Sequence, residues 1–166
     1  MPTVRVRWVG FVALLVVLLV VGAFIGTLLD PDGSTWGFAV VFAGTYLLLV
    51  LVHEVGHVLP GWFFGMRWAN LTFQFGASVR SEHRDGRDRT PSEQLWISLA
   101  GPGLHIAAAS LGLTVFDRNG LSFAAWVGCL FALFDGVANL LPSGRRSDGW
   151  KAVAALADIA RRTVRT

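Results

Sequence analysis

The stretch that decides the fold is residues 36–64, which read WGFAVVFAGTYLLLVLVHEVGHVLPGWFF. It is almost wholly apolar until a short polar group near its end, formed by His53, Glu54 and His57. A helix needs about 20 mostly apolar residues to cross the hydrocarbon core of a bilayer. Core helices of soluble proteins are rarely this long and this apolar on all sides. We therefore predict a membrane-spanning helix that carries polar groups inside the membrane.

Three further blocks are long and apolar enough to span a membrane: residues 8–29, 95–116 and 121–141. Of the 166 residues, 54% are hydrophobic and only 15% are charged, whereas a soluble domain carries about 25% charged residues. This composition excludes a disordered chain, and the single cysteine, Cys129, excludes a disulfide scaffold. We predict an all-α polytopic membrane protein of about four transmembrane helices, forming a single domain over residues 1–166.

The first block has two interpretations. Arg5 and Arg7 before it, and the sequence VGA at residues 21–23, are typical of a signal peptide with a cleavage site. The apolar run continues to Leu29, however, and this favours an uncleaved span.

The basic residues are distributed unevenly between the two ends of the spans. If all four blocks cross the membrane, 13 of the 14 basic residues fall on one side, and only Arg118 falls on the other. By the positive-inside rule, we predict a multi-pass protein of the cell membrane with both termini in the cytoplasm. Because the basic residues lie between apolar blocks and not across a polar surface, we expect no nucleic-acid partner.

Two segments outside the spans show amphipathic patterns. Residues 71–79 alternate apolar and polar side chains, which predicts a strand, or a membrane-associated β-hairpin that turns near Gly76. The charged residues 82–89 would then form a solvated turn. The tail at residues 150–164 combines apolar positions at helical spacing with arginines, which predicts a C-terminal amphipathic helix at the interface.

The polar group in the second span has the pattern H-E-x-x-H. Residues four apart on a helix point to one side, so the imidazoles of His53 and His57 can bind one zinc ion. The carboxylate of Glu54 can move a proton from a metal-activated water to a leaving nitrogen. Ionisable groups inside a span are costly and functional by default. The pattern therefore predicts a Zn²⁺-dependent hydrolase and disfavours a polar helix contact or a pore lining.

Two other residues shape this helix. Gly56 allows another helix or a substrate backbone to approach closely. Pro60 removes a helical hydrogen bond and clashes with the carbonyl of Gly56, so we expect the helix to kink or end just after the histidine pair.

Two histidines leave a catalytic zinc one protein ligand short. The candidates are Asp148, Asp135, His105 and His83. Asp148 lies in a polar segment that can fold back after the fourth span. Asp135 lies one helical turn before Asn139 and forms either a ligand or half of a polar pair. We interpret His105 as a packed, hydrogen-bonded histidine and His83 as a solvated one.

Three motifs, in this order along the chain, resemble those of the site-2 protease family of intramembrane zinc metalloproteases. They are the H-E-x-x-H of residues 53–57, the A-G-P of residues 100–102, and the N-x-x-P…D-G of residues 139–142 and 148–149. The alternating segment between the first two resembles the family's β-hairpin. The likeness covers about residues 36–150 and implies a minimal form without a PDZ-like domain.

The resemblance implies that the Zn²⁺ ligands are His53, His57 and Asp148. It also implies that Glu54 is the general base and that Asn139 is a hydrogen-bond donor to the substrate or the oxyanion. The family usually has asparagine at the place of His105. Its aspartate usually follows an apolar segment about one residue shorter. Asp135 therefore stays an alternative third ligand.

The resemblance also implies a function and its partners. A strand at residues 71–79, with Phe73 and Phe75, would pair with an unwound substrate by strand addition. The chain would hydrolyse peptide bonds in or near transmembrane segments, a reaction known as regulated intramembrane proteolysis. Its partners would be a membrane protein or transmembrane peptide as substrate, and the lipid bilayer. The alternatives are a non-catalytic pseudo-protease that binds metal and transmembrane helices, and a metal transporter. Physiological substrate, oligomeric state and regulatory partners stay open.

Overall fold

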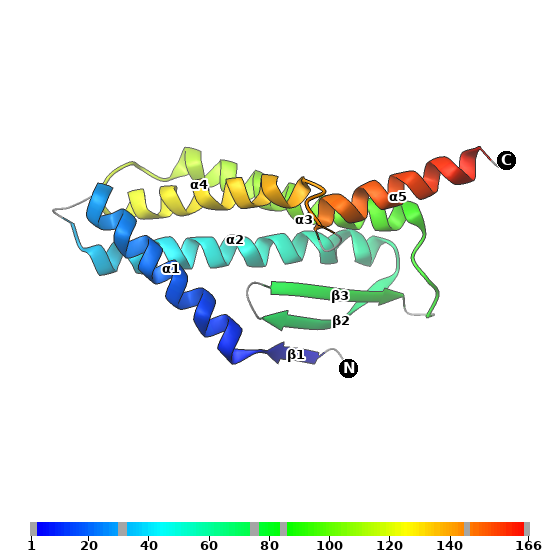
Figure 1. Ribbon diagram of the computed structural model, residues 1–166, viewed down its shortest axis with the longest axis horizontal. Coiled ribbons are helices and arrows are strands. Elements are labelled where there is room, and N and C mark those ends of the chain that lie inside the picture. Colours follow the sequence, from blue (N-terminus) through cyan, green and yellow to red (C-terminus); the bar gives the residue numbers. More distant parts are fainter. Residues whose placement is uncertain (1–2, 30–32, 74–76, 84–85, 145–146, 165–166) are drawn as a thin grey trace.

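The computed structural model describes residues 3–29, 33–73, 77–83, 86–144 and 147–164. These ranges contain five helices and three strands (Figure 1). In chain order the elements are β1 (Thr3–Val6), α1 (Trp8–Leu29), α2 (Thr35–Phe63), β2 (Met66–Phe73), β3 (Ala77–His83), α3 (Pro91–Val115), α4 (Gly120–Leu140) and α5 (Asp148–Thr163).

Four of the helices, α1 to α4, are long and apolar enough to cross a membrane. Their bounds agree with the predicted spans within a residue or two, except that α3 begins four residues early. The early start has a local cause, because the Thr90 hydroxyl accepts the N–H of Glu93 and the Glu93 carboxylate accepts the N–H of Thr90. The prediction of an all-α polytopic membrane protein is confirmed.

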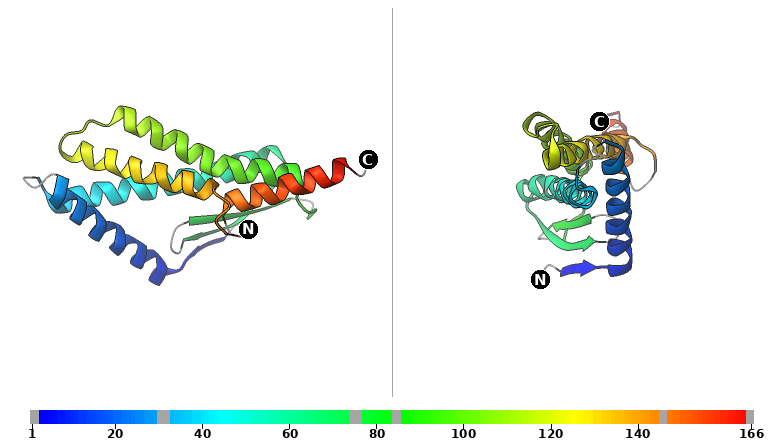
Figure 2. Two further views of the ribbon diagram at one scale, coloured as in Figure 1. Left: turned by 45° about the horizontal axis from the view of Figure 1, so that its top comes forward. Right: turned by 90° about the vertical axis from the view of Figure 1, so that its left-hand side faces the viewer.

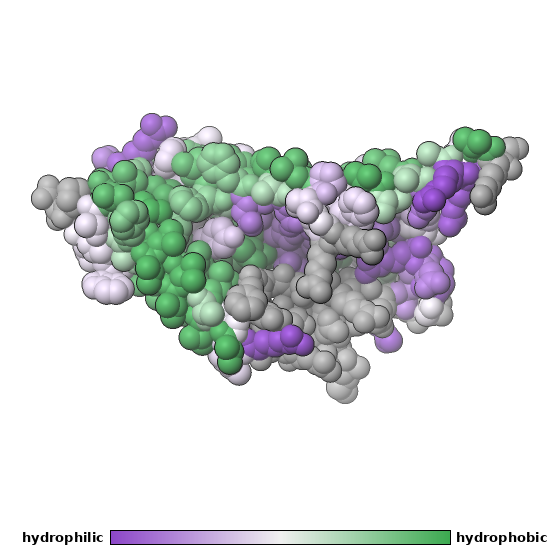
Figure 3. All heavy atoms as spheres, viewed as in Figure 1, coloured by the Kyte–Doolittle hydropathy of each residue, from purple (hydrophilic) through white to green (hydrophobic). Residues whose placement is uncertain are grey.

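The first helix packs obliquely on the second and leaves a wide apolar face uncovered. Gly22 of α1 lies so close to α2 that a Cβ there would be 2.9 Å from the Cα of Ala39. Around this crossing, Leu18, Phe38 and Phe42 form a buried core cluster with residues of α4. Side chains of α1 such as Val16, Val20 and Phe24 are exposed, and Figure 3 shows a broad apolar surface over this helix. This surface suits a lipid environment.

A second core cluster joins α2, α3 and α4. It contains Leu49, Ala109, Cys129 and Ala132. The Cys129 side chain is 2% exposed, as expected of a small packing residue.

The three strands form one sheet in the order β1-β2-β3. The predicted β-hairpin is present, since β2 and β3 pair antiparallel from Met66 opposite His83 to Phe73 opposite Ala77. A single strand through residues 71–79 is therefore wrong, and the predicted turn at Gly76 lies outside the described residues. Strand β1 was not predicted; it runs parallel to β2 and brings the chain's N-terminal segment onto the sheet (Figure 2).

The interpretation of residues 82–89 as a solvated turn is partly wrong. Strand β3 continues to His83, whose ring is buried and places Nε2 3.2 Å from Oε2 of Glu93. Arg87 donates to both oxygens of Glu93, at 3.1 and 2.6 Å. The buried carboxylate of Glu93 thus attaches the end of the hairpin to the start of α3.

The predicted amphipathic helix is α5. Ser147 caps it, with its hydroxyl accepting the N–H of Trp150 at 3.2 Å. Ala152 and Ala155 are buried where α5 packs along α3. Helix α5 thus covers α3 near the sheet-bearing end of the molecule (Figure 2).

Candidate metal centre

Helix α2 brings both histidines of the H-E-x-x-H pattern to one side. The Nε2 atoms of His53 and His57 lie 3.1 Å apart, and the ring centroids lie 4.8 Å apart. His53 and Glu54 are each 7% exposed, so the pattern sits inside the bundle. The helix continues through Pro60 and ends at Phe63, six residues after the second histidine.

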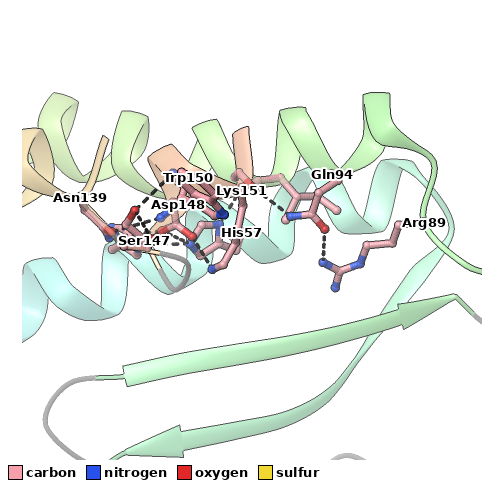
Figure 4. Close-up of polar contacts among 12 residues, drawn as sticks. His57, Arg89, Gln94, Asn139, Ser147, Asp148, Trp150 and Lys151 are labelled. Carbon is pink, nitrogen blue, oxygen red and sulfur yellow. Dashed lines mark hydrogen bonds and ion pairs between the residues drawn. The ribbon is translucent and has the colours of Figure 1, made fainter. Parts of the chain in front are cut away.

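The first residue of α5 supplies a carboxylate to this pair. Oδ2 of Asp148 lies 3.1 Å from Nε2 of His53 and 3.2 Å from Nε2 of His57. Figure 4 shows Asp148 and His57 turned toward one another. Within the described ranges, these three side chains form the group with metal-binding spacing. Asp135 is not in the group; it lies on α4, and its side chain makes a hydrogen bond with Tyr46 of α2.

The three donor atoms fit a zinc ion. Ligand atoms about 2.1 Å from a tetrahedral zinc lie about 3.4 Å from each other, close to the observed 3.1–3.2 Å. The donors are also of the right kind, two imidazole nitrogens and one carboxylate oxygen. All three converging atoms are acceptors when the imidazoles offer lone pairs there, so a cation at their centre relieves their mutual repulsion.

Two of the candidate ligands, His57 and Asp148, are each oriented by a hydrogen bond at the atom that faces away from the group. Nδ1 of His57 donates to the carbonyl of Ile97 at 2.6 Å, which leaves Nε2 of His57 free of hydrogen when the ring is neutral. The second oxygen of Asp148 accepts from the Lys151 ammonium at 2.7 Å. Sequence reasoning missed both partners, although Lys151 stands at the i, i+3 spacing from Asp148 that places two residues on one helix face.

The amide of Asn139 also holds Asp148. Nδ2 of Asn139 donates to Oδ2 of Asp148 at 3.2 Å, and Oδ1 accepts the backbone N–H of Asp148 at 3.3 Å. The same Nδ2 lies 3.3 Å from Nε2 of His53. The sequence prediction placed Asn139 at the site, and the structure does bring it there.

The Asp148 carboxyl is strongly biased toward its ionised form. Burial raises its pKa, but the polar contacts with His53 and His57 and the hydrogen bond from Lys151 outweigh that effect and hold the pKa well below its usual value. An ionised carboxylate is the form that binds a metal ion.

Three glycines allow the elements of the site to meet. A Cβ on Gly56 would lie 2.5 Å from the carbonyl oxygen of Ala100, and a Cβ on Gly101 would collide with the ring of His57. A Cβ on Gly149 would collide with the carbonyl of Leu140 at the end of α4. The expected close approach at Gly56 is therefore made by α3, and Gly149 lets α5 start against α4.

The remaining predicted site residues have mixed outcomes. His105 is buried, as expected of a packed histidine, and lies outside the metal-binding group. His83 is buried, so the expectation that it is solvated is wrong. Phe73 ends β2, and Phe75 lies outside the described residues, so their substrate role stays a prediction.

A cavity of about 510 Å³ connects the site to the surface. It lies between α3 and α5 and has His57 and Asp148 in its wall. Gln94, Ser98 and Lys151 add polar groups along it. Water can thus reach the metal-binding group from the end of the molecule where α5 lies.

Comparison with known proteins shows the class of fold. No family model and no curated protein sequence matches the chain. Among solved structures, the chain is similar to the site-2 protease from Methanocaldococcus jannaschii, with a TM-score of 0.64 and 20% sequence identity. The match covers 94% of this chain and 67% of that one. The chain is an integral membrane protein with a site-2 protease-like fold.

Proposed function

We propose that this protein is an intramembrane zinc metalloprotease that hydrolyses peptide bonds in or near transmembrane segments of other membrane proteins. The observation that carries the proposal is the group of His53, His57 and Asp148, with a buried Glu54 next to His53 on α2, a helix long enough to span a membrane. The likeness in fold to a site-2 protease supports it.

In this proposal His53, His57 and Asp148 hold the zinc ion. When bound, zinc would lower the pKa of a water molecule toward about 7 and polarise the peptide carbonyl. Glu54, which is buried and follows His53 on α2, would accept the proton of the attacking water and pass it to the leaving nitrogen. Asn139 orients Asp148 through both of its amide atoms, and its Nδ2 can also donate to the substrate carbonyl.

The order of strands indicates where an extended substrate would pair. Both edges of β2 are occupied, one by β1 and one by β3. Strand β3 has its second edge on the side of α2, and Figure 4 shows it passing beneath the metal-binding group. We therefore propose that an unwound substrate adds to β3 rather than to β2. Phe73, in β2, would then contribute a side chain and not backbone pairing.

The proposed membrane orientation follows from the charge distribution. The sheet, the cavity mouth and α5 share one end of the molecule (Figure 1), and most basic residues belong to these segments. We propose that this end faces the cytoplasm at the cell membrane. A single cysteine placed at Ser143 or at Asn119, in a Cys129→Ala background, would test it by labelling of intact cells with an impermeant thiol reagent. We expect labelling at position 119 alone, and labelling at 143 alone would reverse the orientation.

The function is tested with purified protein and a set of single-span model substrates in detergent and in liposomes. We expect cleavage that stops in Glu54→Gln while the zinc content stays at one per chain. Unchanged cleavage by Glu54→Gln would contradict the mechanism. One zinc per chain without cleavage of any substrate would favour a pseudo-protease, and zinc flux into liposomes would favour a transporter.

A further inference from the structure

A further buried histidine, His105, lies directly behind His53 of the metal-binding group. His105 of α3 is 0% exposed, and its Nδ1 lies 3.4 Å from Nδ1 of His53. The two rings meet edge to face, with planes at 87° and centroids 5.5 Å apart. Among buried side-chain atoms of the described ranges, Nε2 of His105 is the one without a hydrogen-bond partner. Leaving a buried polar atom unpaired lowers the stability of the folded state, so a histidine at this position needs a physical explanation.

The two nitrogens of His53 face different surroundings. Its Nε2 points at the donor atoms of His57 and Asp148, both 3.1 Å away, and is the atom that would bind the metal. A neutral imidazole that offers a lone pair at Nε2 carries its hydrogen on Nδ1. That hydrogen points to His105, which must accept it at Nδ1. The hydrogen of His105 then sits on Nε2, the atom that has no partner.

The two metal-binding histidines are thus oriented by different means. Nδ1 of His57 donates to the backbone carbonyl of Ile97, which can only accept. Nδ1 of His53 meets a side chain that can be exchanged by mutation. Metal-binding histidines usually donate their second N–H to a carboxylate, a carbonyl or a water. Here an imidazole nitrogen takes that place.

We propose that His105 is a positioning residue, which accepts the Nδ1 hydrogen of His53 and thereby fixes the tautomer and the ring orientation of this ligand for zinc. The inference rests on the proposed zinc site. It accounts for a fully buried histidine whose far nitrogen is unpaired, because only the near nitrogen is used. It also predicts which replacements the site tolerates.

Two substitutions separate positioning from packing. In His105→Asn, the amide oxygen is bonded to Cγ as Nδ1 is in histidine, so the acceptor is kept and the unpaired Nε2 disappears. In His105→Leu, the volume is similar but no acceptor faces His53. We expect His105→Leu to weaken zinc binding about 10- to 100-fold and to change the visible absorption of the Co²⁺-substituted protein. We expect His105→Asn to keep the affinity and the spectrum close to those of the wild type.

Zinc affinity is measured by competition with a chelator on purified protein in detergent. The helical circular dichroism and unfolding temperature of the metal-free forms control for folding. The inference is overturned if His105→Leu binds zinc like the wild type with an unchanged Co²⁺ spectrum. It is equally overturned if His105→Asn is as weak as His105→Leu.

A measurement on the unmutated, zinc-loaded protein covers the case in which His105→Leu fails to fold. With ¹⁵N-labelled histidine, long-range ¹H–¹⁵N spectra assign the tautomer of each of the four imidazoles. We expect the hydrogen on Nδ1 in His53 and on Nε2 in His105, and the hydrogen on Nδ1 of His105 would refute the inference. If zinc binding follows the expected order but nothing is cleaved, the protease proposal alone fails. If all three proteins bind zinc equally and cleave, only the role of His105 fails.

Discussion

The ammonium group of Lys151 lies 2.7 Å from Oδ1 of Asp148, so the two oxygens of this carboxylate face different partners. Oδ2 faces the histidines, and Oδ1 is held by the cation on the next turn of α5. The contact both orients the carboxylate and favours its charged form.

We therefore expect Lys151→Met to weaken zinc binding about 10-fold, the lower end of the usual effect of partners behind a metal ligand. Chelator competition measures the change. The matched control is Arg161→Met, which removes an ion pair with Asp158 on the exposed side of the same helix. If both variants lose the same affinity, the effect is one of net charge and not of the contact with Asp148.

The third ligand can be identified by removing each candidate carboxylate. Asp148→Ala removes a donor atom from the group. Loss of a residue that only orients a metal ligand lowers affinity about 10- to 100-fold, and we expect Asp148→Ala to lower zinc affinity by more than that. Asp135→Ala removes an exposed carboxylate of α4 and should leave the zinc content at the wild-type value. Metal analysis of the purified proteins gives the answer. The reverse order would place the site on α4.

Gly56 lets α2 and α3 meet beside the histidines, and a methyl group there has no room. We expect Gly56→Ala to destabilise the bundle by roughly 1–3 kcal/mol, as overpacking does, and to lower zinc affinity because the helices move apart. Gly44→Ala, on the same helix with no atom within 4 Å of the added Cβ, is the control. Thermal unfolding in detergent compares them. Equal unfolding temperatures for the two variants would contradict the close packing at Gly56.

The carboxylate of Glu93 joins His83, Arg87 and the N-terminus of α3. Glu93→Gln keeps the shape but removes the charge, and we expect a loss of roughly 1–3 kcal/mol in stability because a buried group is left poorly paired. The unfolding temperature in detergent reports the loss. Asp88→Asn changes an exposed carboxylate nearby and should have no such effect. A neutral result for Glu93→Gln would mean that the hairpin is attached to α3 by other contacts.

Local patterns in the sequence predicted the four long helices well, and they predicted that His53 and His57 share one face of a helix. Apolar blocks of about 20 residues identify spans because the bilayer thickness sets their length. The spacing of His53 and His57 identifies a shared face because the helix repeat sets it. The D-G motif predicted Asp148 by resemblance, and the structure brings its carboxylate to the histidine pair.

Contacts between distant segments could not be predicted in the same way. Strand β1 has only four residues, and its partners begin at Asn70, so no local alternation reveals it. The prediction that His83 is solvated was wrong because its partner, Glu93, belongs to the next helix. The pairing of His105 with His53 depends on how α3 crosses α2, which small residues permit but do not specify.

The metal-binding group draws its donors from residues 91 positions apart, on α2 and at the start of α5. An ion held there would close a loop that contains β2, β3, α3 and α4, so metal binding and assembly of these elements would be thermodynamically linked. At a free zinc concentration 1,000 times the dissociation constant, this linkage adds about 4 kcal/mol to the stability of the folded state. Zinc would then connect α2 to the start of α5, and the unfolding temperature would report how much of the site is occupied, without any substrate.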